Sequence, residues 1–249
     1  MTRNPAIQLV IFDKDGVLLD LNATWAPVIR AQADHLARIS AGGVNADTIL
    51  NAVGIETGGA TPHIRDDGLF AAGSYSDIRD TWQRLCPNLA AYLADSTRSR
   101  EEMRALSQQA VRGNTVGKGQ VQQGLEALRK AGYALAVVTN DNSPSTAINL
   151  ADLGLGDMFD LVVAADSGHG RKPEPGGILA CCAAVGSTPE ASVMVGDTRA
   201  DLEAAHAAGC GHFIAIADSA PMHPPHLPEA SMTLGDCGSL VEALCRLPC

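Results

Sequence analysis

The sequence has 249 residues, of which 46% are hydrophobic and 18% charged, and its 28 acidic and 18 basic side chains give a formal net charge of −10. This composition is typical of a globular protein with a sizeable core, so it excludes disorder as the main state, and the acidic balance argues against a nucleic-acid partner. No apolar run approaches the ~18 residues of a membrane span, and residues 1–6 lack a signal-peptide layout, so we expect a cytoplasmic protein without a membrane partner.

The first predicted element is a buried strand, because residues 7–12 form a short apolar run that stops at the charged segment Asp13-Lys14-Asp15-Gly16. From residue 22 to residue 112 the apolar side chains instead recur at helical spacing. We expect helices at 24–39, near residue 47, at 77–85 behind a Ser76 cap, and at 89–111. The sequence predicts no strand in this block, and its glycine-containing stretch 53–74 predicts a loop.

Beyond Gly119 the pattern alternates between helix and strand. The predicted helices cover 120–130, 145–152, 177–185 and 199–208, and the predicted strands cover 134–139, 161–165, 192–195 and 213–217. Short apolar strands separated by amphipathic helices indicate a parallel sheet covered on both faces, a Rossmann-like doubly wound α/β fold.

The order of these elements predicts two domains. We expect an α/β core domain made of residues 1–20 and 114–249, with a small all-helical cap domain, residues 21–113, inserted after the first strand. An insertion at this point leaves from the carboxyl edge of the sheet, where ligands bind in open α/β folds. The cap domain is therefore expected to act as a lid.

Polar residues follow four of the predicted strands. They are Asp13 and Asp15 after the first strand, Thr139 and Asn140 at the end of the second, Lys172 beyond the third, and Asp197 and Asp201 after the fourth. Because the carboxyl ends of parallel strands share one edge of a sheet, we expect these side chains to lie close together. An Asp-Gly pair after a strand is by itself an ordinary turn, so the prediction of a site depends on all four clusters.

At this point the sequence resembles the haloacid dehalogenase superfamily of aspartate-nucleophile phosphotransferases. The resemblance consists of four motifs in the family's order, which are Asp13-Lys14-Asp15-Gly16-Val17, Thr139, Lys172-Pro173, and Gly196-Asp197 with Asp201. It covers nearly the whole chain, since the helical block resembles the family's small helical cap of the C1 type. Four ordered motifs are a more specific signal than any one of them. Among the subgroups, the sequence looks most like the phosphoglycolate phosphatases.

The resemblance implies a role for each reacting residue. Asp13 would be the nucleophile that forms an aspartyl-phosphate, and Asp15 would act first as general acid and then as general base. Thr139 and the backbone N–H groups around Gly16 would bind the phosphoryl oxygens. Asn140 is a further phosphate-binding candidate, although asparagine also suits the turn that follows it.

Cations are needed here because a carboxylate that attacks a phosphate monoester brings like charges together, an opposition of ~4 kcal/mol per close pair. Lys172 would supply one positive charge and Mg²⁺ the other. The resemblance implies that Asp13, Asp197 and the backbone carbonyl of Asp15 hold this ion. Asp201 would orient Lys172 or a metal-bound water, although its place in the first turn of a helix also permits a purely structural role.

Two residues depart from the family's usual first motif. Lys14 stands where an apolar residue is usual, and Val17 stands where threonine is common. Neither change removes a reacting group. The carboxylate of Asp15 disfavours dehalogenase activity, since the dehalogenase branch lacks an acid at that position.

The sequence therefore predicts a Mg²⁺-dependent phosphatase that hydrolyses a small phosphorylated metabolite, with phosphoglycolate as the leading substrate. Two alternatives use the same motifs. A phosphosugar mutase, similar to β-phosphoglucomutase, would return the phosphoryl group to its product, and a non-catalytic phospho-acceptor module would keep it as a signal. Asp15 argues against the second alternative, because a lasting phosphoaspartate needs no adjacent acid–base group. The oligomeric state is not predicted.

Overall fold

The computed structural model describes residues 3–59, 62–65, 68–72, 75–217, 227 and 229–248. The chain forms two compact units. One is made of residues 1–20 and 116–249, and the other of residues 21–115. We call them the core unit and the helical unit.

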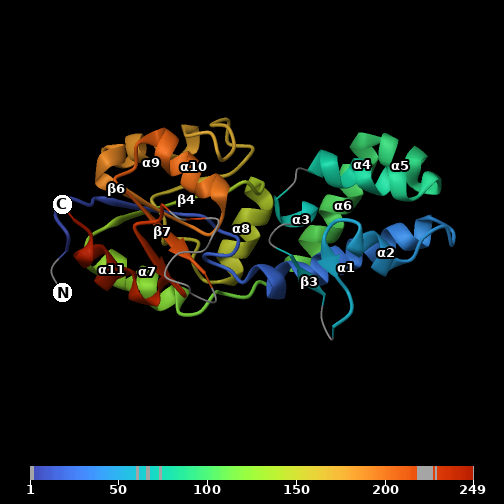
Figure 1. Ribbon diagram of the computed structural model, residues 1–249, viewed down its shortest axis with the longest axis horizontal. Coiled ribbons are helices and arrows are strands. Elements are labelled where there is room, and N and C mark those ends of the chain that lie inside the picture. Colours follow the sequence, from blue (N-terminus) through green and yellow to red (C-terminus); the bar gives the residue numbers. More distant parts are fainter. Residues whose placement is uncertain are drawn as a thin grey trace. The chain divides into compact units, whose positions relative to one another are not determined.

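The core unit is built on a parallel sheet (Figure 1). Its strands are β1 (Leu9–Phe12), β4 (Ala134–Val138), β5 (Leu161–Val163), β6 (Ser192–Gly196), β7 (His212–Ile216) and β8 (Met232–Leu234), in the order β5-β4-β1-β6-β7-β8. The register places Phe12 beside Val137 of β4 and Val195 of β6, so these three strands reach the carboxyl edge together. The predicted doubly wound parallel sheet is confirmed.

The two faces of the sheet bury different side chains, because successive residues of a strand point to opposite sides. In β1, Val10 and Phe12 belong to one apolar cluster, and Leu9 and Ile11 belong to another. The first cluster includes residues of α7 (Val121–Lys130), α8 (Ser143–Asp152) and α11 (Leu240–Arg246), and the second includes residues of α9 (Gly176–Val185) and α10 (Arg199–Ala208). Figure 1 shows α9 and α10 on one side of the strands and α7 and α11 on the other. Burial on both faces explains why the strands are continuous apolar runs in the sequence.

Two helices of the core unit begin immediately beyond the carboxyl edge of the sheet. The side chain of Asn142 caps α8 by accepting a hydrogen bond from the backbone N–H of Ser145. Thr198 caps α10 in the same way through the N–H of Asp201, and α10 ends at Gly209, whose left-handed backbone (φ 81°) suits glycine. These caps fix the loops that follow β4 and β6.

The helical unit has an apolar core of its own. Its helices are α1 (Leu21–Ile39), α2 (Ala46–Asn51), α3 (Leu69–Ala72), α4 (Tyr75–Leu85), α5 (Ala90–Ala94) and α6 (Ser96–Val111). The buried Trp82 of α4 donates its indole N–H to the carbonyl of Ile49 in α2 (3.1 Å). Among the residues described in either unit, no helix has both the length and the apolar character needed to cross a membrane.

The structure differs from the sequence prediction in its shortest elements. An antiparallel pair, β2 (Ile55–Glu56) and β3 (His63–Ile64), lies in the block where the sequence predicts no strand. The helix predicted at 89–111 is broken at Asp95, which caps α6, and Ser76 lies inside α4 instead of before it. The sequence analysis also missed β8 and α11. β2 and β3 have only two residues each, and Thr233 interrupts the apolar run of β8, so none of these three strands shows a readable apolar run in the sequence.

Candidate active site

The predicted site residues lie where the strands of the core unit end. Asp13 directly follows β1, and its backbone N–H donates to the carbonyl of Val195 in β6 (2.9 Å). Asp197 directly follows β6. The strand order reverses here, since β4 and β5 lie on the far side of β1 while β7 and β8 lie on the far side of β6. Open α/β sheets bind ligands at such a point, so the topology itself favours this edge as the active site.

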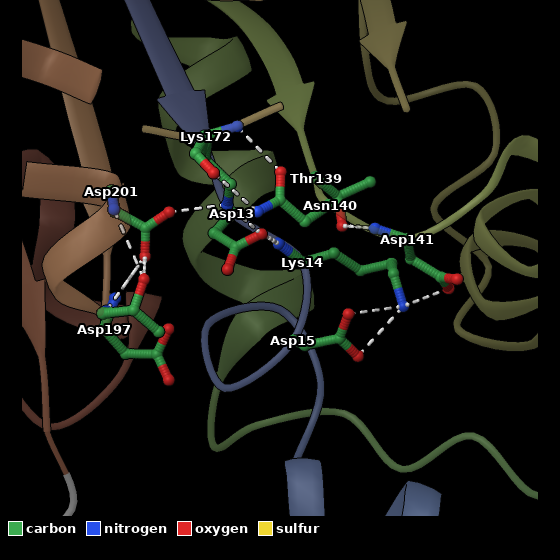
Figure 2. A network of polar contacts seen from close by, with 10 residues as sticks. Asp13, Lys14, Asp15, Thr139, Asn140, Asp141, Lys172, Asp197 and Asp201 are labelled. Carbon is green, nitrogen blue, oxygen red and sulfur yellow. Dashed lines mark hydrogen bonds and ion pairs between the residues drawn. The ribbon is translucent and has the colours of Figure 1, made fainter. Parts of the chain in front are cut away.

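A buried lysine bridges two of the predicted carboxylates (Figure 2). Lys172 Nζ lies 2.6 Å from Asp13 Oδ1 and 2.5 Å from Asp201 Oδ1, and all three side chains are at least nine-tenths buried. Burial lowers the pKa of the Lys172 ammonium, but the charges of the two carboxylates outweigh burial and hold this pKa above its ordinary value. Lys172 is therefore a fixed positive charge beside Asp13.

The Asp13 carboxylate is costly to ionise despite this contact. Its Oδ1 also accepts a hydrogen bond from the backbone N–H of Lys14 (2.6 Å). Burial raises the pKa of Asp13, Lys172 opposes this effect, and the charges of Asp201 and Asp15 raise it further, so that the pKa is about 7. An additional cation next to Asp13 would favour its charged form.

Asp201 is held in place from two directions. Its Oδ2 accepts hydrogen bonds from the backbone N–H of Thr198 (2.9 Å) and from the Thr198 hydroxyl (2.6 Å). The Asp197 N–H donates to the same oxygen (3.2 Å). Because Oδ2 is bound by the first turn of α10, Oδ1 is presented to Lys172. The helix cap thus serves to fix the lysine that contacts Asp13.

Three carboxylates come close enough to hold a metal ion. Asp13, Asp197 and Asp201 each offer an oxygen, and these oxygens lie within 4.8 Å of one another. Burial and the charges of Asp13 and Asp201 raise the pKa of Asp197 well above its ordinary value. A divalent cation would relieve this crowding of negative charge, and carboxylate oxygens suit Mg²⁺. Both Asp201 oxygens already have partners, so Asp13 and Asp197 are the better ligands.

The missing side chain of Gly16 leaves space for the Asp197 carboxylate next to the segment Asp13-Lys14-Asp15-Gly16. The Gly16 backbone is left-handed (φ 76°), and a Cβ at this position would overlap the Asp197 carboxylate. Its N–H donates to the carbonyl of Leu19 (3.0 Å). In this structure Gly16 contributes through its missing side chain, whereas the sequence analysis gave it a role in phosphate binding.

A second buried lysine lies one residue after the nucleophile candidate. Lys14 is fully buried, and its Nζ contacts both carboxylate oxygens of Asp15 (3.0 and 2.9 Å), Asp141 Oδ2 (3.1 Å) and Asn149 Oδ1 (2.8 Å). Burial lowers the pKa of Lys14, and the charges of Asp15 and Asp141 raise it to a value above the ordinary one. Figure 2 shows Lys14 with Asp15 and Asp141 beside the group formed by Lys172, Asp13 and Asp201.

The loop after β4 contacts both buried lysines, Lys14 through Asp141 and Lys172 through Asn140. Thr139 is buried, and its hydroxyl oxygen accepts a hydrogen bond from the backbone N–H of Asp141 (3.1 Å). The Asn140 amide donates to the carbonyl of Lys172 (2.9 Å) and accepts from the N–H of Lys172 (2.8 Å). Both polar groups of the Asn140 side chain therefore hold the Lys172 backbone, although the sequence analysis placed this side chain on phosphate.

The structure brings the predicted residues of all four strand ends to one edge. The sequence analysis did not recognise the parts played by Lys14, Asn149 and Thr198, and it noted Lys14 only as a departure from the family motif. The only signal for Lys14 was a charged residue where the resembled family usually has an apolar one.

A family profile of haloacid dehalogenase-like hydrolases matches residues 7–209, a range that contains every residue of this site. The chain belongs to this family. Among curated relatives of this haloacid dehalogenase-like hydrolase, the phosphoglycolate phosphatase of Pseudomonas putida is 28% identical over 202 residues, which are 81% of this chain and 66% of that protein. The phosphoglycolate phosphatase of Chromobacterium violaceum is 30% identical over 205 residues, 82% of each chain.

The solved structures agree with this family assignment at the level of the fold. A HAD phosphatase from Thermococcus onnurineus is 21% identical to this haloacid dehalogenase-like hydrolase and superimposes with a TM-score of 0.65 over 96% of this chain and 98% of that one. The sequence match spans just under two thirds of the length of the Pseudomonas protein. It spans 34–49% of the length of six other phosphoglycolate phosphatases.

Proposed function

We propose that the protein is a phosphatase that hydrolyses a small phosphorylated metabolite through an aspartyl-phosphate on Asp13, with Mg²⁺ as cofactor. The observation that carries the proposal is the pair of motif aspartates, each in contact with a buried lysine of its own. Asp13 stands beside Lys172, and Asp15 stands two residues away beside Lys14. The proposal assigns the attack to Asp13 and the proton exchange to Asp15. The names of the curated relatives make 2-phosphoglycolate the first substrate to test.

The charges around Asp13 fit attack on a phosphate monoester. The attacking carboxylate and the dianionic ester repel each other, and Lys172 offsets this repulsion from a fixed position. Asp13 and Asp197 would hold Mg²⁺, with the backbone carbonyl of Asp15 as a further ligand suggested by the family resemblance. The ion would supply Lewis-acid stabilisation of the phosphoryl oxygens.

The proposed reaction has two steps. A carboxylate oxygen of Asp13 bonds to phosphorus while the bond from phosphorus to the ester oxygen breaks, and that oxygen takes a proton from Asp15. In the second step Asp15 accepts a proton from water, whose oxygen bonds to phosphorus and releases Asp13. Thr139 and Lys172 would hold the phosphoryl oxygens in both steps.

The inserted helical unit is the segment that we propose selects the substrate. All the reacting groups named above belong to the core unit. A segment inserted between β1 and the rest of that unit can vary without altering them, which is how one chemistry serves different substrates within a fold.

Phosphate release tests the proposal. Wild-type protein with Mg²⁺ should release one equivalent of inorganic phosphate per 2-phosphoglycolate, measured with malachite green. Asp13→Asn should reduce the rate by at least about a thousandfold, because it removes the nucleophile but keeps the shape of the side chain. No release from any member of a panel of monoesters would reject the phosphatase. Isomerisation without phosphate release would favour the mutase, and a phosphoprotein stable for hours would favour the phospho-acceptor module.

A further inference from the structure

We infer that Lys14 is a positioning residue that holds the Asp15 carboxylate in place for proton transfer. The inference rests on the proposed function, since it assigns to Lys14 a part in the acid–base step of that reaction. Lys14 has no exposed surface, so it acts on the reaction through Asp15 and not by touching the substrate.

The Lys14 ammonium lies in a buried cluster of hydrogen-bond acceptors. A buried ammonium is costly unless it is paired and hydrogen-bonded, and it has three N–H donors to satisfy. Acceptors from three residues meet Nζ at 2.8–3.1 Å, namely Asp15, Asp141 and Asn149. These contacts satisfy the ammonium donors and hold the ammonium beside Asp15.

Asp15 is the most exposed member of the cluster. Its side chain is 24% exposed, against 16% for Asp141, so it faces the open side of the network. Both of its oxygens lie within 3.0 Å of Lys14 Nζ. A single cation contacted by both oxygens fixes the orientation of the carboxylate as well as its location. An apolar residue at position 14 could not do this.

Two further partners of Lys14 lie in α8 and in the loop that precedes it. Asn149 is fully buried in α8, and Asp141 lies in the short loop between β4 and that helix. The backbone N–H of Asp141 also donates to Thr139, which is the candidate phosphate ligand. Lys14 thus connects Asp15 to the loop that carries Thr139. Asp15, the proposed proton donor, and Thr139, the candidate phosphate ligand, are therefore positioned by the same loop.

A test follows from the proton that Asp15 supplies. An alkoxide leaving group needs that proton as its bond to phosphorus breaks, whereas p-nitrophenolate leaves without it. The value of kcat/KM reports the steps through departure of the leaving group. Loss of Asp15 positioning should therefore lower kcat/KM for an alkyl ester and spare kcat/KM for the nitrophenyl ester. A general loss of structure would lower both.

We would compare Lys14→Met with wild type on 2-phosphoglycolate and on p-nitrophenyl phosphate, both with Mg²⁺. We expect kcat/KM to fall about 10- to 100-fold for 2-phosphoglycolate and less than about threefold for p-nitrophenyl phosphate, since general acid catalysis contributes roughly 100-fold or more. A burst of p-nitrophenolate should also appear, because Asp15 acts as base in the second step. Lys130→Met, the same change at an exposed lysine, is the matched control and should leave both substrates unaffected.

A second variant keeps the inference testable if Lys14→Met does not fold. Asn149→Leu removes one acceptor of Lys14 with little change in side-chain shape, and it should show the same selective loss at smaller size. Lys14→Arg should recover part of the 2-phosphoglycolate activity by restoring a cation. Equal losses on both esters, or no loss on either, would overturn the inference while wild-type phosphate release stands. Failure of the wild type to hydrolyse any ester would instead reject the proposed function, and the inference with it.

Discussion

Asp13 shows a conflict between folding stability and the charge that the proposed reaction needs. Its carboxylate is buried and has a pKa of about 7, against 3.8 in an unfolded chain. Such an acid contributes most to folding below pH 4, and this contribution is lost as the pH rises from about 4 to about 7, because only the folded state retains the proton. The charge that attacks phosphorus is therefore present at neutral pH at the expense of the fold.

This conflict predicts that Asp13→Asn makes the metal-free protein more stable while making it inactive. At pH 7.5 the free energy of unfolding should rise by up to ~4 kcal/mol, since a pKa raised from 3.8 to about 7 corresponds to ~4 kcal/mol with the favourable Lys172 contact already included. The gain should shrink as the pH is lowered toward 4. Urea titrations at several pH values, with EDTA present, would measure it. A gain that does not depend on pH would show that ionisation of Asp13 is not its source.

The proposed role of Asp197 as a metal ligand can be tested by thermal unfolding, without measuring activity. A ligand that binds only the folded state at 100 times its Kd stabilises that state by ~2.7 kcal/mol. Mg²⁺ should therefore raise the melting temperature of the wild type, and Asp197→Asn should remove most of this rise. Asp157→Asn, at an exposed loop position, should keep the full rise. An unchanged Mg²⁺ effect in Asp197→Asn would take this residue out of the metal site.

The site residues that could be predicted from the sequence lie at strand ends, whereas the contacts that could not be predicted join side chains far apart in the chain. Asp13, Asp197 and Lys172 could be expected to meet because they follow parallel strands, and strand ends share an edge whatever the details of packing. The buried contacts of Lys14 depend on Asn149, which is 135 residues away in the sequence. A hydrogen bond between two side chains at that separation is set by tertiary packing, and no local pattern records it.

At the scale of the element, the first turn of α10 links helix stability to the site. Thr198 and Asp201 form a capping box, and the same Asp201 contacts Lys172. We predict that Thr198→Ala lowers the free energy of unfolding by ~1 kcal/mol and also lowers kcat/KM, because Asp201 loses the hydroxyl that fixes it. Asn45→Ala removes the cap of α2 and should cost similar stability without the loss of activity. Equal changes in kcat/KM for the two variants would show that the α10 cap contributes to stability only and does not position Asp201 for the reaction.

Element prediction succeeded where the periodic pattern was long enough to read. The helix predicted at 199–208 coincides with α10, which begins at a threonine cap and ends before a glycine. β2 and β3 have only two residues each, and β8 lacks the continuous apolar run by which β5, also three residues long, was predicted. The helix predicted at 89–111 is interrupted because Asp95 is the N-cap of α6. Hydrophobic periodicity alone does not detect an N-cap within a helical pattern.

In the molecule as a whole, each unit has an apolar core of its own. Among the described residues, the two apolar clusters of the core unit draw only on residues 7–18 and 121–247, and the cluster of the helical unit draws only on residues 21–106. The chain leaves the core unit after Asp20 and re-enters it at Val116, and the N–H of Asp20 donates to the carbonyl of Val116 (2.8 Å). The two ends of the core chain are thus already adjacent where the helical unit is inserted.

This arrangement predicts that the core unit survives removal of the helical unit. Replacing residues 21–115 with a short Gly-Ser linker should leave a protein that unfolds cooperatively, because the linker spans ends that are hydrogen-bonded to each other and both sheet faces remain covered. The rise in melting temperature with Mg²⁺ should persist, since Asp13 and Asp197 are both retained. Selectivity among phosphate esters should fall, as expected if the helical unit chooses the substrate. Thermal melts and an ester panel would measure these outcomes, and a shortened chain without a cooperative transition would show that the two cores depend on each other.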